Sequence, residues 1–217
     1  MLYAQIRKDE EINALLNKGN ANLRVLGFTD HSQAHTAVVA DRAAMILERF
    51  GFSTHDQELA RIAGYMHDIG NAVNRKHHAE YGGILANDIL KKYDLSVEDR
   101  ITIVSAISNH DESTGRAVDA ISAALIIADK SDVRRNRVCD EMKDFDIHDR
   151  VNYAVVGTKL KVDVENKVIS LNLEIDEEYC NMYDYFEIFL GRMMMCRNAA
   201  AMLGAEFKLK ANGIKIL

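Results

Sequence analysis

The chain has 217 residues, a formal net charge of −6 and 48% hydrophobic residues. This length can bury a substantial core, and the composition is that of an ordinary globular protein. Lys and Arg are not in excess, which argues against a nucleic-acid scaffold. No apolar run approaches the length of a membrane span, and the charges at residues 7–11 begin too early for a signal peptide.

The cysteines indicate the compartment. Cys139, Cys180 and Cys196 are scattered and odd in number, and no C-x-x-C motif occurs. We therefore expect free thiols in a reducing environment, and a cytoplasmic protein.

Helical periodicity dominates the first 150 residues. It predicts helices over 5–20, 35–50, 55–68, 78–93, 97–110 and 118–131, with polar loops at 69–77 and 111–117. Thr54 and Gln57 match a capping box for the third helix, and Gly51 is placed to end the second. The helix over 118–131 is apolar nearly all round, so we expect it at the centre of a bundle.

After about residue 150 the apolar period changes from helical to alternating. Residues 159–164 and 168–175 alternate apolar with polar side chains and predict a β-hairpin. Residues 177–203 return to helical spacing, and Asn212-Gly213 predicts a second hairpin over 206–217. The predicted fold is therefore mainly α. A helical bundle over residues 1–148 is followed by a small α+β appendage over residues 149–217, with two hairpins and a long helix.

Histidines and aspartates stand at the ends of the apolar helices. His67 and Asp68 end one helix, His110 closes another, and Asp129 lies within the apolar run that begins at Leu125. A buried unpaired carboxylate would be costly, but a bound cation offsets that cost. Singly, each residue is more often a cap or a surface charge. Together they indicate a metal site, and mixed imidazole and carboxylate donors suit first-row transition metals.

Three segments carry a resemblance to a known family. His35 opens a Val/Ala-rich helix over residues 35–43, residues 63–70 contain His-Asp-Ile-Gly, and Ala128-Asp129 closes a later helix. In this order and at this separation they resemble the HD-domain superfamily of metal-dependent phosphohydrolases. The similar stretch covers roughly half of the chain and implies an HD-type helical bundle.

The resemblance also implies a set of metal ligands. Four would form the core of the site, and two further histidines are added in members that hold two ions. They are His35, His67, Asp68 and Asp129, with His78 and His110. We expect two divalent transition-metal ions (Fe, Mn, Zn, Ni or Co, with Mg less suited). His77 remains an alternative to His78, and His31 an alternative to His35.

The activity implied is hydrolysis of a phosphoester or phosphoanhydride by a metal-activated water. The substrate would be a nucleotide or another small phosphorylated molecule. His67 and Asp68 would be catalytic, with Asp68 bridging the ions and orienting the nucleophile. Lys130, Arg134 and Arg75 are candidates for binding the substrate phosphate. Lys130 and Arg134 would share a helix face four residues apart.

Departures from the family pattern narrow the range of candidate substrates. Members that act on cyclic dinucleotides carry Lys after Ile-Gly, a His-His pair and a proline motif, whereas this chain has Asn71, His110-Asp111 and no proline. This difference disfavours a cyclic dinucleotide. The alternative function is a non-catalytic module whose metal stabilises the bundle, with the appendage serving dimerisation or partner binding. A third and less favoured hypothesis is an oxygenase, because some di-iron members of the family are oxygenases. The exposed hairpin edges also allow a homodimer.

Overall fold

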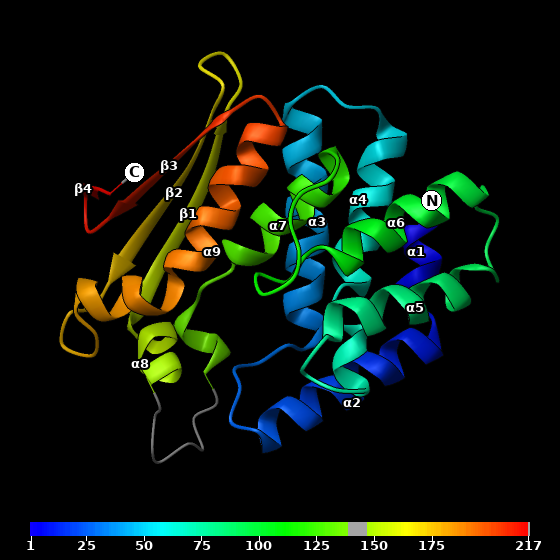
Figure 1. Cartoon of the computed structure of the whole chain (residues 1–217), viewed down its shortest axis with the longest axis horizontal. Helices are drawn as coiled ribbons and strands as arrows, with labels where there is room; N and C mark the ends of the chain where they lie inside the picture. Colours follow the sequence, from blue (N-terminus) through cyan, green and yellow to red (C-terminus); the bar gives the residue numbers. More distant parts are fainter. Residues whose placement is uncertain (139–146, 217) are drawn as a thin grey trace.

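The computed structural model describes residues 1–138 and 147–216. Figure 1 shows a helical bundle beside a small sheet, which confirms the predicted fold class. The helical elements up to the sheet are α1 (Tyr3–Ile6), α2 (Glu10–Val25), α3 (Gln33–Arg49), α4 (Thr54–Met66), the 3₁₀ helix η1 (Ile69–Ala72), α5 (His78–Leu90), α6 (Val97–Ser108), α7 (Ala120–Lys130), the 3₁₀ helix η2 (Arg135–Arg137) and α8 (Ile147–Ala154).

Side-chain caps determine where the helices begin. Ser32 accepts a hydrogen bond from the Ala34 amide at the start of α3. Ser53 and Asp56 form a reciprocal capping box at α4. The capping box predicted at Thr54 is therefore wrong by one residue, because Thr54 is already helical. Such a cap contributes about 1 kcal/mol, enough to set the start of a helix.

The N-terminal region departs from the single helix predicted over residues 5–20. Asp9 has an extended backbone and accepts from the Ile12 amide, so it caps α2 and separates it from α1. Ile6, Ile12 and Leu16 are nevertheless all buried, since both helices present their apolar residues to the bundle. The apolar pattern was interpreted correctly, and the break at Asp9 was missed.

Helix α7 lies at the centre of the bundle, as its apolar surface predicts. Its residues from Ile121 to Ala128 are all buried, and α7 packs against α3, α4, α6 and α9. Helices α3 and α4 approach closely where Gly64 meets Ala40, since a Cβ atom on Gly64 would lie 2.7 Å from the Ala40 Cα. This close packing brings the start of α3 near the end of α4.

In the described part of the chain, four strands form one mixed sheet of order β1-β2-β3-β4. Strands β1 (Val155–Asp163) and β2 (Val168–Ile175) form the first predicted hairpin, and β3 (Glu206–Ala211) and β4 (Ile214–Lys215) form the second. The turn between β3 and β4 has positive φ at Asn212 and Gly213. The sequence did not predict that β2 and β3 pair in parallel, connected by α9 (Met182–Met202).

Helix α9 joins the sheet to the bundle. It packs against both β3 and α7, and the buried residues of bundle and sheet form one continuous cluster. The division of the chain after residue 148 stays a prediction. It adjoins residues 139–146, including Cys139, which lie outside the described residues. Cys180 and Cys196 are buried free thiols.

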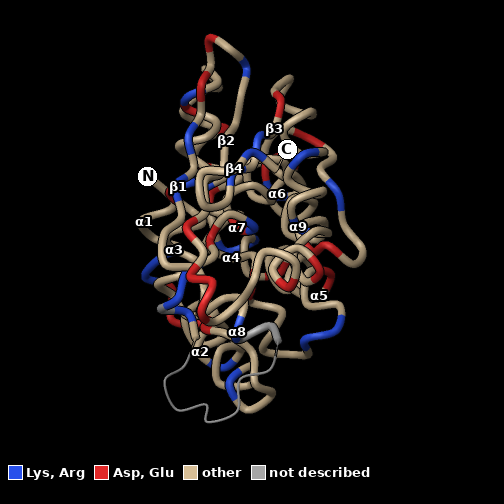
Figure 2. The backbone as a smooth tube through the Cα atoms, turned by 90° about the vertical axis from the view of Figure 1, so that its left-hand side faces the viewer, with Lys and Arg blue, Asp and Glu red and all other residues tan. Residues whose placement is uncertain are grey.

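Charged side chains are spread over the molecule. Figure 2 shows Lys and Arg interspersed with Asp and Glu along the described chain. None of the described helices combines the length and the apolar character that a membrane span requires.

Candidate metal centre

The six expected ligands lie at the ends of five helices that converge on one point. His35 is in the first turn of α3, His67 is the C-cap of α4 and Asp68 follows it, His78 is the first residue of α5, His110 follows the C-cap of α6, and Asp129 is next to the last residue of α7. Five are buried, and the Asp129 side chain is 12% exposed. Helix ends supply these side chains because a chain leaving a helix can turn two neighbouring residues toward one point.

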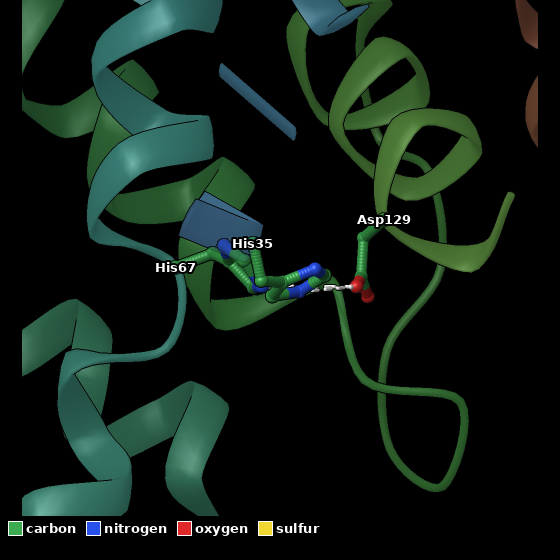
Figure 3. A group of neighbouring side chains, drawn as sticks. All are labelled: His35, His67 and Asp129. Carbon is green, nitrogen blue, oxygen red and sulfur yellow. Dashed lines mark ion pairs between the residues drawn. The ribbon is translucent and has the colours of Figure 1, made fainter. Parts of the chain in front are cut away.

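One group of donor atoms comes from His35, His67 and Asp129, whose ligand atoms all lie within 4.8 Å of one another. Figure 3 shows both imidazole rings directed at the carboxylate. Oδ1 of Asp129 lies 3.3 Å from His35 Nε2 and 3.7 Å from His67 Nε2. Three helices thus contribute one ligand each.

A second group shares His67 and adds Asp68 and His110, again with ligand atoms within 4.8 Å of one another. His78 adjoins this group, because its Nε2 lies 3.2 Å from the Nε2 of His110. The two oxygens of Asp68 face different partners. Oδ2 lies 3.2 Å from His67 Nε2 and 3.8 Å from His35 Nε2, whereas Oδ1 lies 3.8 Å from His78 Nε2. Asp68 therefore stands between the two groups.

Hydrogen bonds outside the cluster orient all four histidine rings. Each Nδ1–H donates away from the cluster, over 2.7–3.1 Å. The acceptors are the backbone carbonyls of Gly64 for His67, Ile107 for His110 and Arg75 for His78, and the carboxylate of Asp132 for His35. A carbonyl oxygen only accepts, so Nδ1 carries the proton and the Nε2 lone pair is left for a ligand.

Inside the cluster, the Nε2 lone pairs of the histidines consequently face one another and the carboxylate oxygens. Nε2 of His35 and Oδ2 of Asp68 are buried and make no hydrogen bond with any described residue. An unsatisfied buried polar atom costs about 1–3 kcal/mol, and a shared cation removes that cost. The donor set of imidazole nitrogens and carboxylate oxygens fits a divalent transition metal.

The pKa shifts of His110 and Asp129 agree with this donor set. Burial, with the neighbouring His67 and His78, lowers the pKa of His110 to about 3. Burial raises the pKa of the Asp129 carboxyl, but Lys130 and the nearby histidines outweigh it and hold that pKa well below its usual range. For His67 burial lowers the pKa, yet Asp68 and Asp129 outweigh burial and raise it. The carboxylates are thus ionised, and the cluster attracts a cation.

A small cavity opens onto the cluster. It has a volume of about 20 Å³ and is lined by Asp68, His78, His110 and Asp129, together with the residues of its mouth. Room for about one water-sized particle begins near 10–15 Å³, so the cavity suits an ion or a water molecule. Thr29, His31, Arg75, Lys130, Arg137 and Arg192 line the rest of it.

The structure distinguishes the alternative histidines. His77 has a left-handed backbone, its side chain is 47% exposed, and its ring lies 3.5 Å from Glu80, whereas His78 is buried in the cluster. His31 lines the cavity but is not one of the clustered ligands, and its Nδ1 is 2.6 Å from the Thr29 carbonyl oxygen. The geometry thus favours His78 and His35 as ligands.

Two of the three expected phosphate-binding residues line this cavity. Lys130 Nζ lies 2.9 Å from Asp129 Oδ2 and 2.6 Å from Glu112 Oε2. Arg75 Nη1 lies 3.3 Å from His78 Nε2. The helix face expected to hold both Lys130 and Arg134 does not form, because α7 ends at Lys130. Arg134 instead pairs with Asp132 and lines a different cavity.

Several residues that build the site were missed by sequence reasoning. Asp132 is buried and holds His35 Nδ1 at 2.8 Å. In the sequence, only its position three residues after Asp129 could have indicated a role in the site. Asn71 donates to Oδ1 of Asp68 over 2.8 Å. Arg192 also lines the cavity, and it comes from α9, for which the sequence around the motif gives no signal.

The HD domain family model matches residues 33–137. These residues belong to the HD-domain superfamily. The matched range contains all six expected ligands, and HD domains bind divalent metals and are generally metal-dependent hydrolases. The chain is also 25% identical to the uncharacterized protein MJ1020 of Methanocaldococcus jannaschii over 205 aligned residues, covering 82% of this chain and 77% of the relative.

Proposed function

We propose that this HD-domain protein hydrolyses a phosphoester or phosphoanhydride of a nucleotide or another small phosphorylated molecule. The observation that carries the proposal is the convergence of four Nε2 lone pairs and two ionised carboxylates beside a cavity rimmed by cations. A purely structural ion would need the ligands alone. The cationic rim favours an enzyme over the non-catalytic module, because it suits an incoming phosphate.

The ligand set divides into two parts in this proposal. His35, His67 and Asp129 would hold one ion, and His78 and His110 the other. Asp68 would serve both, because its two oxygens face the two parts. The bound metal would supply Lewis-acid stabilisation of phosphoryl oxygens and a water of lowered pKa.

The chain's own residues then position the reactants. Asn71 donates to one oxygen of Asp68 and so fixes the orientation of that carboxylate. Burial lowers the pKa of Lys130, but Asp129 and Glu112 outweigh burial and raise it, so Lys130 stays protonated. It would contribute a fixed positive charge beside the phosphoryl oxygens. Arg75, held against the ring of Phe28 with 5.3 Å from its guanidinium carbon to the ring centre, would contribute a second.

A small substrate is favoured over a nucleic acid. The net charge is −6, and Lys and Arg are interspersed with Asp and Glu along the described chain (Figure 2). The cavity of about 20 Å³ has room for about one ion or water molecule, so most of a substrate would lie outside it.

The proposal is tested by metal analysis and phosphate release. Purified protein supplied with Mn²⁺ should hold more than one metal equivalent, and a single equivalent would contradict the two-ion version.

The Mn²⁺-loaded protein should release phosphate or nucleotide from at least one member of a panel of aryl phosphates, mononucleotides, dinucleoside polyphosphates and cyclic nucleotides. Asp68→Asn should abolish that activity without changing the circular dichroism spectrum. Unchanged activity in Asp68→Asn would refute the site, and metal binding with no turnover on any substrate would favour the non-catalytic module.

A further inference from the structure

A second cavity lies where the bundle meets the sheet. It is lined by Arg42 of α3, by Val133, Arg134 and Arg135 after α7, and by residues 155–158 at the start of β1, and its volume is about 280 Å³. This volume is close to the lower end of small-molecule pockets, about 300–1,000 Å³. The cavity shares no lining residue with the one at the metal centre.

The charged residues that line the cavity are all cations, and their carboxylate partners lie outside the lining. Three arginines line the cavity, and no carboxylate among the described residues lines it. Each arginine has a hydrogen-bond partner that does not line the cavity. Arg42 donates to Ser131 Oγ over 3.0 Å, Arg134 to Asp132 over 2.9 Å, and Arg135 to Asp176 over 2.8 Å. These contacts fix the guanidinium planes, because each plane is anchored at a known edge.

Donor capacity remains for a ligand. A guanidinium has five N–H groups. The contacts of Arg134 and Arg135 occupy Nε and Nη2, and those of Arg42 involve one hydrogen on each of Nη1 and Nη2. At least three N–H groups on each arginine therefore make no hydrogen bond with the residues that the structure describes. Strand β1 is an edge strand, so part of its backbone also faces away from β2.

We propose that this cavity is a second binding site, specific for the phosphate group of a small molecule. Planar guanidinium groups match phosphate oxygens with paired hydrogen bonds, and three of them around one small cavity suit an anion with several oxygens. The apolar Val133 and Val155 border the same cavity and can contact the remainder of the ligand.

The site is linked to the metal centre through Asp132. Oδ2 of Asp132 accepts from His35 Nδ1 over 2.8 Å and from Arg134 Nη2 over 2.9 Å, and its Oδ1 lies 3.6 Å from Arg42 Nη2. A phosphate that binds the remaining N–H groups of these arginines offsets part of the positive charge that Arg42 and Arg134 direct at Asp132. The carboxylate is then freer to hold His35, so the ligand acts on a metal ligand without touching it. This second step rests on the proposed metal centre, whereas phosphate binding does not.

Val156 offers a clean test of binding. Its side chain is 51% exposed and it lines the cavity, so a polar replacement should not disturb the core. Calorimetric titration of the full protein with inorganic phosphate should show binding in the wild type and in Val156→Gln. In Val156→Glu the added carboxylate should weaken that binding about tenfold or more. Equal phosphate affinity in all three proteins would overturn the proposed site.

Parallel titrations identify the ligand and test the link. A nucleotide site would bind a nucleoside monophosphate or triphosphate more tightly than inorganic phosphate and would lose that binding in Val156→Glu. A site for free phosphate would bind inorganic phosphate more tightly. Phosphate should change the Mn²⁺ affinity of Val156→Gln and not of Val156→Glu, by reciprocity of coupled binding. No change in Val156→Gln would overturn the link through Asp132. The two proposals can fail separately. If the protein has no hydrolase activity but Val156→Glu still loses phosphate binding, the proposed function is refuted and this binding site is supported.

Discussion

The most informative single substitution is Asp132→Asn. The Asp132 carboxylate is fully buried and accepts the Nδ1–H of His35, which leaves the His35 Nε2 directed at Asp129. An asparagine keeps the shape and can still accept that proton with its amide oxygen, but it loses the charge. A hydrogen bond to a charged group contributes about 1.5–3 kcal/mol and a neutral one about 0.5–1.5 kcal/mol. The difference of about 1–1.5 kcal/mol should appear as an approximately tenfold loss of metal affinity.

Metal affinity would be measured by competition with a chelating dye, alongside the thermal midpoint of the metal-free protein. Asp41→Asn is the matched control, because Asp41 lies on the same helix as His35 with its side chain 69% exposed, paired only at the surface with Arg61. The control should bind metal as the wild type does. Wild-type affinity in Asp132→Asn would refute the inference that Asp132 positions His35. So would an equal loss in Asp41→Asn.

Three further predictions use neighbouring residues as controls. His78→Asn should lower the number of bound metal equivalents, measured by elemental analysis, whereas His77→Asn should not, because His77 is exposed and asparagine tolerates its left-handed backbone. Gly64→Ala should lower the free energy of chemical unfolding, since overpacking costs about 1–3 kcal/mol against about 1 kcal/mol of gained helix propensity, whereas Gly191→Ala, which meets open space, should raise it. Because burial lowers the pKa of His110 to about 3, the metal-free protein should lose stability as pH falls below 6.5, and His110→Gln should reduce that loss in urea titrations.

The sign of the pH effect follows from the protons bound in each state. Between about pH 6.5 and 3 the unfolded chain protonates His110 and the folded chain does not, so each unit of acidification favours unfolding by up to about 1.4 kcal/mol. His67 acts in the opposite direction, because Asp68 and Asp129 raise its pKa against the effect of burial. An unchanged pH slope in His110→Gln would contradict the buried, neutral state of this ring. For the two glycines, destabilisation by both substitutions or by neither would contradict the packing argument.

The parts of the site that the sequence predicted are those encoded locally. His67 and Asp68 end a helix whose apolar period is visible in the chain, and α7 is apolar on all sides because it is buried on all sides. Helix caps are also encoded by neighbouring residues, although the predicted cap was Thr54 and the structure has the cap at Ser53. The shared helix face of Lys130 and Arg134 was wrong because it required α7 to continue beyond the predicted range of 118–131, and α7 ends at Lys130.

The remainder depends on contacts between distant segments. Asp132 and His35 are 97 residues apart, and their hydrogen bond exists only because α7 packs along α3. The parallel pairing of β2 with β3 requires α9 to return the chain along the same sheet. Periodicity reports which face of an element is buried, and it does not report which partner buries that face.

Helix α9 shows why the appendage belongs to the site. Arg192 Nε lies 3.0 Å from Glu112 Oε1, the other oxygen of Glu112 lies 2.6 Å from Lys130, and Lys130 lies 2.9 Å from Asp129. Burial raises the pKa of the Glu112 carboxyl, but Lys130 and Arg192 outweigh it and lower that pKa, so Glu112 is ionised. Since Lys130 is buried, removing either neighbour would leave its charge insufficiently compensated. The long helix of the appendage therefore helps to hold a cation at the mouth of the metal centre, and the bundle alone would lack part of its rim.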